Sequence, residues 1–288
     1  MTSNTTDTRG VIGDPSVAPS RIWAIVKLLS SRDRGLEISE LEKALMPSAH
    51  LSENALRNVL HLNLKEAREA GLIQEIQDSI VLSESLYSAV NDADYPPHII
   101  LTNALLSDTS QRNEALFFGI AWLLEQDPYA DPSLLSHGPT VSSMANDQVD
   151  KLTRVTSDAT FSTFFSWANW LGFSHQSPLS GSVRSLIPDP TNQIRPRISS
   201  IMGNSRDIPI ATFMTTLSQS TPVFEGGKFR IEIASDKHEG HLSKSTSLAL
   251  LRLEREGLIE LDQRSDATVF VIQDGKGTSR VSHISLKE

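Results

Sequence analysis

The sequence predicts a mainly α-helical protein with small β-hairpins, built from two similar end modules and a helical segment between them. Two observations support this fold class. First, a phrase that opens with His-Leu-Ser, continues as a leucine-rich run and reaches a glycine followed by Leu-Ile and short apolar runs occurs twice, at residues 50–82 and 241–272. Second, residues 113–125 and 159–170, which lie between the two copies, are apolar over the length of a helix.

The C-terminal copy of the phrase predicts a capped helix followed by a hairpin. Ser243 stands at an N-cap position, where its hydroxyl can accept from the first turn of the helix, and Gly257 can adopt the left-handed conformation that ends a helix. Residues 258–261 and 268–272 are short apolar or β-branched runs around a polar loop, which is typical of paired strands. A capped helix followed by a hairpin is the second half of a winged helix-turn-helix module.

The N-terminal copy contains a complete module of this kind. The predicted elements are helices at 21–30 and 38–45, a third helix from the N-cap Ser52 to Gly71, and a hairpin of residues 72–76 and 80–82. The expected fold is therefore two winged helix-turn-helix domains flanking a helical middle domain.

Breaks in the pattern divide the chain into four segments. Residues 91–97 (NDADYPP) and the three prolines of residues 187–196 favour loops, and a new helix is expected over 208–217. The predicted segments are a flexible tail at 1–18, a winged helix at 19–90, a helical domain at 98–200 and a second winged helix at 204–288. The aromatic stripe of the middle domain, Phe161 to Leu171, is interpreted as core.

A basic stripe follows a core stripe along the third N-terminal helix. At about 100° per residue, the two stripes fall on neighbouring faces. The core stripe contains Leu56, Leu60, Leu64 and Ala67, and the basic stripe contains Arg57, His61, Lys65 and Arg68. The basic stripe predicts contacts to DNA phosphates or base edges, but such stripes are also common on solvated helix faces, and this alternative stays open.

The C-terminal module offers a second set of candidate DNA contacts: Lys244, Ser245, Ser247 and Arg264. Leu248 and Leu251 project on the same side as Lys244, and apolar side chains are poor phosphate contacts. This favours a second hypothesis, in which the winged helices are docking surfaces for other subunits. The two leucines are equally expected to bury against the module's own hairpin or the helix at 208.

Composition limits the classes of function. The net charge is −9, with most of the acidic excess in the middle segment, so DNA contacts must come from local stripes. There are no cysteines, which excludes disulfides and thiolate chemistry, and no apolar run reaches the length of a membrane span. We expect a cytoplasmic protein without a membrane segment.

Motifs of catalysis are few. The sequence contains no metalloprotease, Walker, dinucleotide-binding or nucleophile-elbow motif. Asp236, His238 and His241 could hold a metal, but solvated turn residues are the better interpretation, and Asp274 with Lys276 is only a fragment of a nuclease site. Asp266, the nearest second carboxylate, is in the preceding loop. We therefore predict no enzymatic activity and no cofactor.

The order of several phrases along the chain resembles the DpdG family. The phrases are PSRIWAIVKLLSS, FFSWANWLGFS, LIPDPTNQIRPRI, PVFEGGKFR and LSKSTSLALLRLEREGLIELDQRSDATVFVI. The resemblance covers most of residues 19–285 and implies a role beside bacterial systems that insert 7-deazaguanine bases into DNA and restrict DNA lacking them.

The first hypothesis is therefore a non-catalytic accessory subunit that binds double-stranded DNA in such an antiviral defence system, together with its other subunits. The alternative is a protein–protein scaffold of the same complex. A transcriptional regulator is less favoured; the helix-glycine-hairpin phrase occurs in many transcription factors, but it indicates a fold and not a function. A nuclease is less favoured because only the Asp274 fragment supports it.

Overall fold

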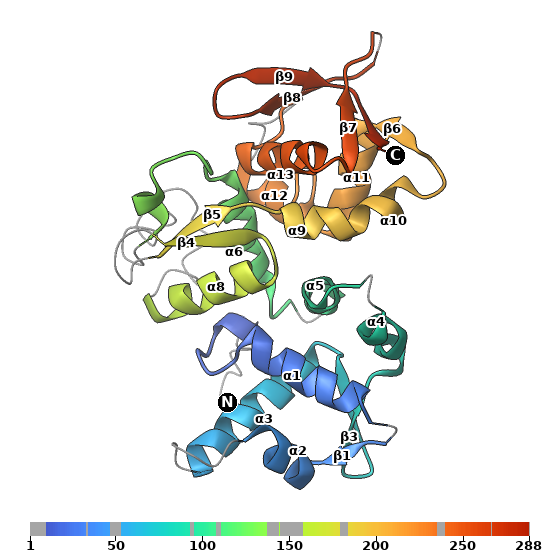
Figure 1. Cartoon of the computed structure of the whole chain (residues 1–288). Coiled ribbons are helices and arrows are strands. Elements are labelled where there is room, and N and C mark those ends of the chain that lie inside the picture. Colours follow the sequence, from blue (N-terminus) through green and yellow to red (C-terminus); the bar gives the residue numbers. More distant parts are fainter. Residues whose placement is uncertain are drawn as a thin grey trace, which may run out of the picture. The chain divides into compact units, whose positions relative to one another are not determined.

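The protein is described by a computed structural model, drawn in Figure 1. The structure describes residues 10–32, 34–46, 53–92, 95–107, 111–136, 144, 158–178, 184–234, 240–265 and 267–287. The chain divides into two compact units: Met1–Leu116 with Ser162–Leu171 form unit 1, and Phe117–Phe161 with Gly172–Glu288 form unit 2. The predicted segment boundaries stay predictions.

Unit 1 contains helices around a three-stranded antiparallel sheet. In chain order its elements are η1 (Gly10–Ile12), α1 (Pro19–Ser30), β1 (Leu36–Glu37), α2 (Ile38–Leu45), α3 (Glu53–Glu69), β2 (Ile73–Ile76), β3 (Ser79–Leu82), η2 (Glu84–Leu86), α4 (Tyr87–Asn91) and α5 (Pro97–Ser107). The strand order is β1-β3-β2. Helices α6 (Glu114–Glu125) and α8 (Asp158–Trp170) contribute residues to both units.

The sequence of unit 1 explains its local structure. Glu37 ends β1 and begins α2, where its side chain and that of Glu40 form a capping box. Gly71, with φ of 69°, follows α3 and allows the chain to turn into β2. Gln77 and Asp78, at φ of 48° and 64°, form the two-residue turn between β2 and β3. The predicted helices and hairpin are therefore confirmed here, while the N-cap Ser52 lies outside the described residues.

Unit 2 has three small sheets among its helices in the described part of the chain. In chain order its elements are η3 (Pro132–Leu135), β4 (Ser174–Pro178), β5 (Arg184–Pro188), α9 (Thr191–Ile194), η5 (Arg195–Arg197), α10 (Ile198–Met202), β6 (Asp207–Pro209), α11 (Ile210–Ser220), α12 (Lys228–Ala234), α13 (Lys244–Arg255), β7 (Ile259–Asp262), β8 (Phe270–Gln273), β9 (Thr278–Val281) and β10 (His283–Leu286). The sheets are β6-β10-β7, β4-β5 and β8-β9.

The predicted pairing of residues 258–261 with 268–272 is wrong. Strand β7 pairs with β10, in the register Ile259↔Leu286, while β8 pairs with β9. The reason is local: residues 274–277 form a tight turn, closed by a 3.2 Å hydrogen bond from Asp274 N to Gly277 O, that folds β8 onto the strand next to it in sequence. Figure 1 shows the β8–β9 hairpin above α13.

The middle segment is also less purely helical than predicted. Strands β4 and β5 pair in the register His175↔Ile187, where the sequence interpretation placed helices and a proline-rich connector. Asp189 follows β5 and accepts from Thr191 N at 3.0 Å, so the connector begins the short helix α9. The protein is mainly helical with small antiparallel sheets, as expected.

The aromatic stripe of α8 is core. Phe164, Trp167, Ala168 and Leu171 are fully buried. Trp167 Nε1 lies 3.4 Å from the carbonyl oxygen of Val17, to which it donates, and this contact ties α8 to the segment before α1. Among the described residues, no helix is long and apolar enough to cross a membrane.

Candidate nucleic-acid interface

Helix α3 presents its predicted basic stripe to solvent. Leu60, Leu64 and Ala67 are buried against unit 1, and Leu56 is half-buried. Since the basic stripe is offset by one residue, its members all fall on the outer side of the helix. Arg57, His61, Lys65 and Arg68 are exposed. The structure therefore brings together the four residues that the sequence singled out on this helix.

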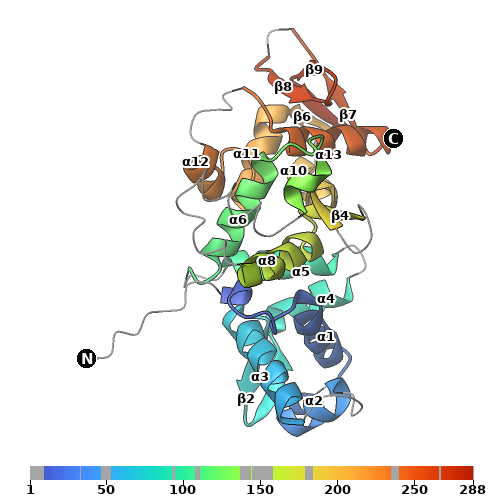
Figure 2. The same ribbon diagram turned by 90° about the vertical axis from the view of Figure 1, so that its left-hand side faces the viewer.

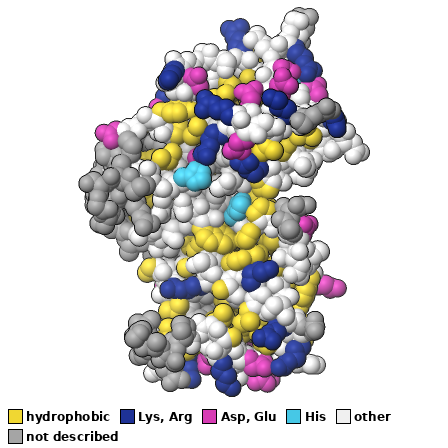
Figure 3. Space-filling model, viewed as in Figure 1, with side chains coloured by type: hydrophobic (Ala, Val, Ile, Leu, Met, Phe, Trp, Pro, Cys, Tyr) yellow, Lys and Arg dark blue, Asp and Glu magenta, His cyan; other side chains and the backbone are white. Residues whose placement is uncertain are grey.

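Two of these cations are in ion pairs. Arg57 Nε lies 3.3 Å from Glu42 Oε2 of α2, and Arg68 Nη2 lies 2.5 Å from Glu75 Oε2 of β2. The Arg68–Glu75 pair is solvent-exposed, whereas in the other pair Arg57 is exposed and Glu42 is half-buried. Exposed pairs contribute only about 0.2–1 kcal/mol each. A phosphate group could therefore replace the carboxylates at little cost. Figure 3 shows that, on its visible face, lysine and arginine side chains alternate with aspartate and glutamate side chains.

In unit 2 the predicted contacts Ser245 and Ser247 are fully buried, and their assignment to a DNA surface is wrong as the unit is folded. Ser245 Oγ donates to the carbonyl oxygen of Leu124 at 2.5 Å. The hydroxyl of Ser247 has no hydrogen-bond partner in the described part of the chain. The physical reason is that the first turn of α13 packs against the end of α6, which single-sequence periodicity does not reveal.

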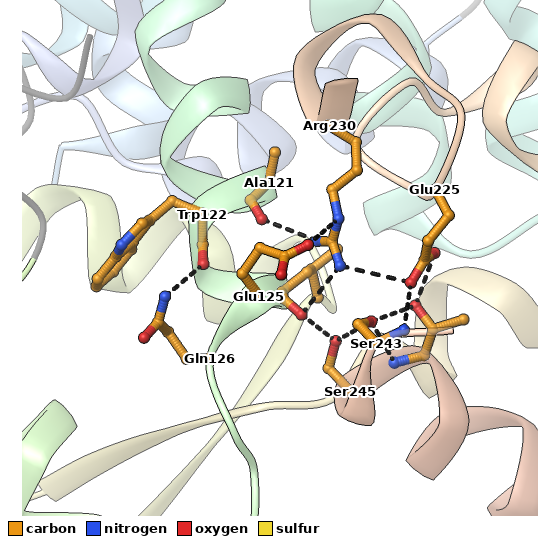
Figure 4. Close-up of polar contacts among 10 residues, drawn as sticks. Ala121, Trp122, Glu125, Gln126, Glu225, Arg230, Ser243 and Ser245 are labelled. Carbon is orange, nitrogen blue, oxygen red and sulfur yellow. Dashed lines mark hydrogen bonds and ion pairs between the residues drawn. The ribbon is translucent and has the colours of Figure 1, made fainter. Parts of the chain in front are cut away.

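A buried polar network holds these two helix ends together, as Figure 4 shows. Arg230 of α12 is 2% exposed; its Nη1 donates to Ala121 O at 2.9 Å and its Nη2 to Leu124 O at 3.4 Å. These carbonyls belong to the last two turns of α6, and that of Leu124 is among the four that have no partner within the helix. The guanidinium also lies 2.5 Å from Glu125 Oε1.

The same network continues to the start of α13 through Glu225. Its Oε1 accepts from Ser243 N at 2.9 Å, and its Oε2 accepts from Thr246 Oγ1 at 3.0 Å. Ser243 also caps α13 by accepting from Thr246 N, which confirms the predicted N-cap. Burial favours the neutral form of Glu225, but Arg230 and the hydrogen bonds from Ser243 outweigh this and lower its pKa. A carboxylate thus occupies the N-terminus of α13, where a phosphate would otherwise bind.

The two remaining predicted contacts in unit 2 are held by carboxylates. Lys244 pairs with Asp127, in the segment after α6. Arg264 Nη1 and Nη2 donate to the two oxygens of Asp207 at 2.8 and 2.7 Å. Hydrogen bonds from Arg264 lower the pKa of Asp207, so this carboxylate stays charged and the bidentate pair fixes the loop after β7 onto β6.

The candidate metal and nuclease residues form no site in the described structure. Asp236, His238 and Asp266 lie outside the described residues. Asp274 Oδ1 accepts from Lys276 N at 2.9 Å and Gly277 N at 2.6 Å, which lowers its pKa and identifies it as a turn residue. Within the described residues, no group of three His, Asp or Glu side chains is arranged to hold a metal ion.

Sequence interpretation did not count two exposed cations of unit 2 as DNA contacts, Lys276 in the β8–β9 turn and Arg280 on β9. The signal was present as the run Gly-Lys-Gly-Thr-Ser-Arg, residues 275–280, whose first part was interpreted as a turn or a fragment of a nuclease site. Because the first turn of α13 is no longer a candidate DNA surface, the exposed cations to consider in unit 2 are those of the hairpin above α13.

Comparison with known proteins gives one match. Searches of curated proteins and of solved structures find none. A family model described as DpdG-like matches residues 10–267, which is most of the chain and includes α3 and α13 with their preceding helices. The protein therefore belongs to the DpdG-like family.

Proposed function

We propose that the protein is a non-catalytic, DNA-binding accessory subunit of a bacterial system that places 7-deazaguanine bases in DNA and restricts DNA lacking them. Membership of the DpdG-like family supports the link to a Dpd modification system. The proposal assigns duplex binding to unit 1, through helix α3.

The arrangement of α1, α2, α3 and the β1-β3-β2 sheet supports a winged helix in unit 1. Strand β1 leads directly into α2, and α3 leads through Gly71 into the β2–β3 hairpin. In winged-helix proteins the helix at the position of α3 enters the major groove. Unit 2 has a similar order with one added helix, since β6 leads directly into α11, α12 follows, and α13 leads through Gly257 into β7.

The observation that carries the proposal is the exposed cationic side of α3. Arg57, His61 and Lys65 lie at successive i,i+4 positions on the solvent side of a helix whose neighbouring face is anchored in the core. Side chains so spaced can meet phosphates along one groove, and phosphate contacts supply most of the affinity in non-specific binding. The acidic net charge of −9 is no obstacle to a contact made by one local stripe.

The test is the salt dependence of duplex binding, measured by fluorescence anisotropy. Each lost phosphate contact lowers the slope of log affinity against log salt by about 0.9. We expect Arg57→Ala with Lys65→Ala to weaken binding and to lower the slope by about 1.8. The variant should keep its circular dichroism spectrum, since both side chains are exposed.

A matched control removes one cation of α1, Lys27, and one from the loop after it, Arg32. Lys27→Ala with Arg32→Ala changes the net charge of unit 1 equally, and both positions are exposed. This variant should bind like the wild type. Leu60→Ala, at a side chain 7% exposed, should instead destabilise unit 1 by about 2–5 kcal/mol. Wild-type protein that fails to bind duplex at low salt would overturn the proposal.

A second candidate function is a protein–protein scaffold in the same complex, and one observation favours it for unit 2. The first turn of α13 is enclosed by α6 and capped by Glu225, so the helix that reads DNA in other winged helices is committed to internal contacts. Leu248 and Leu251 are half-buried on α13, a helix that packs against β8, as expected of a packed face. Co-purification with subunits encoded by neighbouring genes, undiminished in the Arg57→Ala and Lys65→Ala variant, would support this function.

The non-catalytic assignment is part of the proposal. One carboxylate oxygen of Asp274, the candidate acid, accepts hydrogen bonds from two backbone N–H groups of its own turn. We expect the purified protein to leave duplex DNA intact with Mg²⁺ or Mn²⁺, as judged by gel electrophoresis. Metal-dependent cleavage that disappears in Asp274→Ala would contradict this assignment.

A further inference from the structure

The hairpin of β8 and β9 ends in an exposed tip rich in hydrogen-bond donors. Residues 275–280 are all exposed, and they contain two cations, Lys276 and Arg280, and two hydroxyl groups, Thr278 and Ser279. Arginine, lysine, serine, threonine and backbone N–H groups are the donors that bind phosphate oxygens of DNA. The carboxylate that precedes the tip, Asp274, accepts from Lys276 N and Gly277 N.

The tip is held in place on unit 2. Ile272 and Val281 are each 2% exposed, so the hairpin has a buried inner side. Its base is tied to the segment before α13, because Val271 N donates to Gly240 O at 2.8 Å and Leu242 N donates to Val271 O at 3.0 Å. A donor surface fixed in this way loses little conformational freedom when it binds.

Tyr129 supports the turn itself. A Cβ atom at Gly275 would lie only 2.9 Å from Cγ of the Tyr129 ring, so the ring packs directly on the glycine backbone. Burial is the main cause of the raised pKa of Tyr129; nearby Asp274 adds to this shift, while Arg255 opposes it. Arg255, at the end of α13, is exposed and, like Asp274, lies near enough to Tyr129 to act on it electrostatically, so it adds a third cation near the turn. Figure 2 shows the hairpin beside α13 from a second direction.

The two modules differ at the corresponding place. In unit 1 the second and third strands of the sheet, β2 and β3, are joined by Gln77 and Asp78, next to Glu75. In unit 2 the corresponding strands, β7 and β10, are joined by residues 263–282, which include the cationic hairpin. Unit 1 therefore has an open cationic helix and an acidic turn, whereas unit 2 has a helix with a closed first turn and a cationic hairpin.

We propose that the tip of the β8–β9 hairpin, residues 275–280, together with Arg255, is a second DNA-contacting surface that binds the phosphate backbone of the duplex. The inference rests on the proposed DNA-binding function and moves the contact of unit 2 from α13 to the hairpin. It requires no rearrangement of the buried first turn of α13.

The experiment compares Lys276→Ala with Arg280→Ala against the wild-type full chain by anisotropy on one duplex. Loss of two phosphate contacts should lower the salt slope by about 1.8, so the fall in affinity between 50 and 200 mM salt should become about 12-fold smaller. A hydroxyl-radical footprint should lose part of its protected region and keep the part protected by α3.

The matched control is Lys228→Ala with Lys287→Ala, which removes two exposed cations from α12 and from the end of β10. Its salt slope should equal that of the wild type. A hairpin variant with an unchanged slope and footprint, while Arg57→Ala with Lys65→Ala remains impaired, would overturn this inference and leave the proposed function standing. Polyglutamate that competes with the labelled duplex for the hairpin as effectively as unlabelled duplex DNA does would identify an acidic protein surface as the partner. This result would also overturn the inference.

Discussion

Arg230 shows how one side chain can join three segments of unit 2. Its guanidinium is shielded from solvent, since Arg230 is only 2% exposed. It donates hydrogen bonds to carbonyl oxygens of α6 and forms ion pairs with Glu125 and Glu225. Through Glu225 its charge also fixes the capped start of α13. The ion pairs of Arg230 therefore stabilise the packing of these segments inside unit 2.

We expect Arg230→Met to destabilise the protein by about 3–5 kcal/mol in urea unfolding followed by circular dichroism, because both glutamates lose their buried partner. Adding Glu225→Gln to this variant should recover part of the loss. The control is Arg195→Ala, which breaks the exposed ion pair between Arg195 Nη2 and Glu256 Oε2, 2.5 Å apart. This variant should lose at most about 1 kcal/mol of stability. Equal losses in the two single variants would show that the network is not structural.

Glu225 should make stability depend on pH. Burial raises its pKa, but Arg230 and Ser243 reverse this, so the pKa in the folded protein is below its usual value of 4.5. The unfolded chain therefore binds the proton more tightly, and this contribution is present above pH 4.5 and is lost as the pH falls through the lowered pKa. Urea midpoints of Glu225→Gln should fall less over this acid range than those of the wild type. An equal fall would contradict the assignment.

At the scale of the element, both modules end their long helix with a glycine in the left-handed conformation. Gly71 and Gly257 have φ of 69° and 76°, and a Cβ at either position would meet nothing within 4 Å. The requirement for glycine is therefore conformational and not steric, and it is the same in the two modules.

We predict that Gly71→Ala and Gly257→Ala each destabilise the protein by about 1 kcal/mol, since the left-handed conformation costs alanine about 1–2 kcal/mol and the stiffer unfolded chain offsets part of this. Gly277→Ala is the control, because its backbone is ordinary and its Cβ would lie 3.9 Å from Asp274. Its unfolding midpoint should match or exceed that of the wild type. A loss confined to one module would contradict the equivalence of the two helix ends.

Sequence periodicity predicted the helices better than the strand partners. The ends of α2 and α8 and the cap of α13 follow from residues within one or two turns, so a single sequence carries enough information. The pairing of β7 with β10 depends on a strand that is distant in sequence, and the apolar run 268–272 matched it equally well as a partner. Local pattern does not distinguish between such strands.

At the scale of the whole molecule, the same limit applies to the candidate site. The exposed face of α3 was predictable because its core stripe and basic stripe are both written within one helix. Burial of Ser245 and Ser247 was not, because it comes from α6, more than a hundred residues earlier. Net charge was equally uninformative: the value of −9 describes neither the cations of α3 nor those of the hairpin.

The long connection between β7 and β10 has a consequence for the order of folding. Closing a loop costs entropy that grows with the logarithm of its length, so twenty intervening residues, 263–282, cost about 2 kcal/mol more than the two residues between β2 and β3. The turn at 274–277 reduces the length of chain that must be closed, because β8 and β9 can pair first and bring β10 back towards β7. We therefore expect the β8–β9 hairpin to form before β7 pairs with β10. The sheet of unit 1 should need no such intermediate step, because its β2 and β3 are already neighbours in sequence.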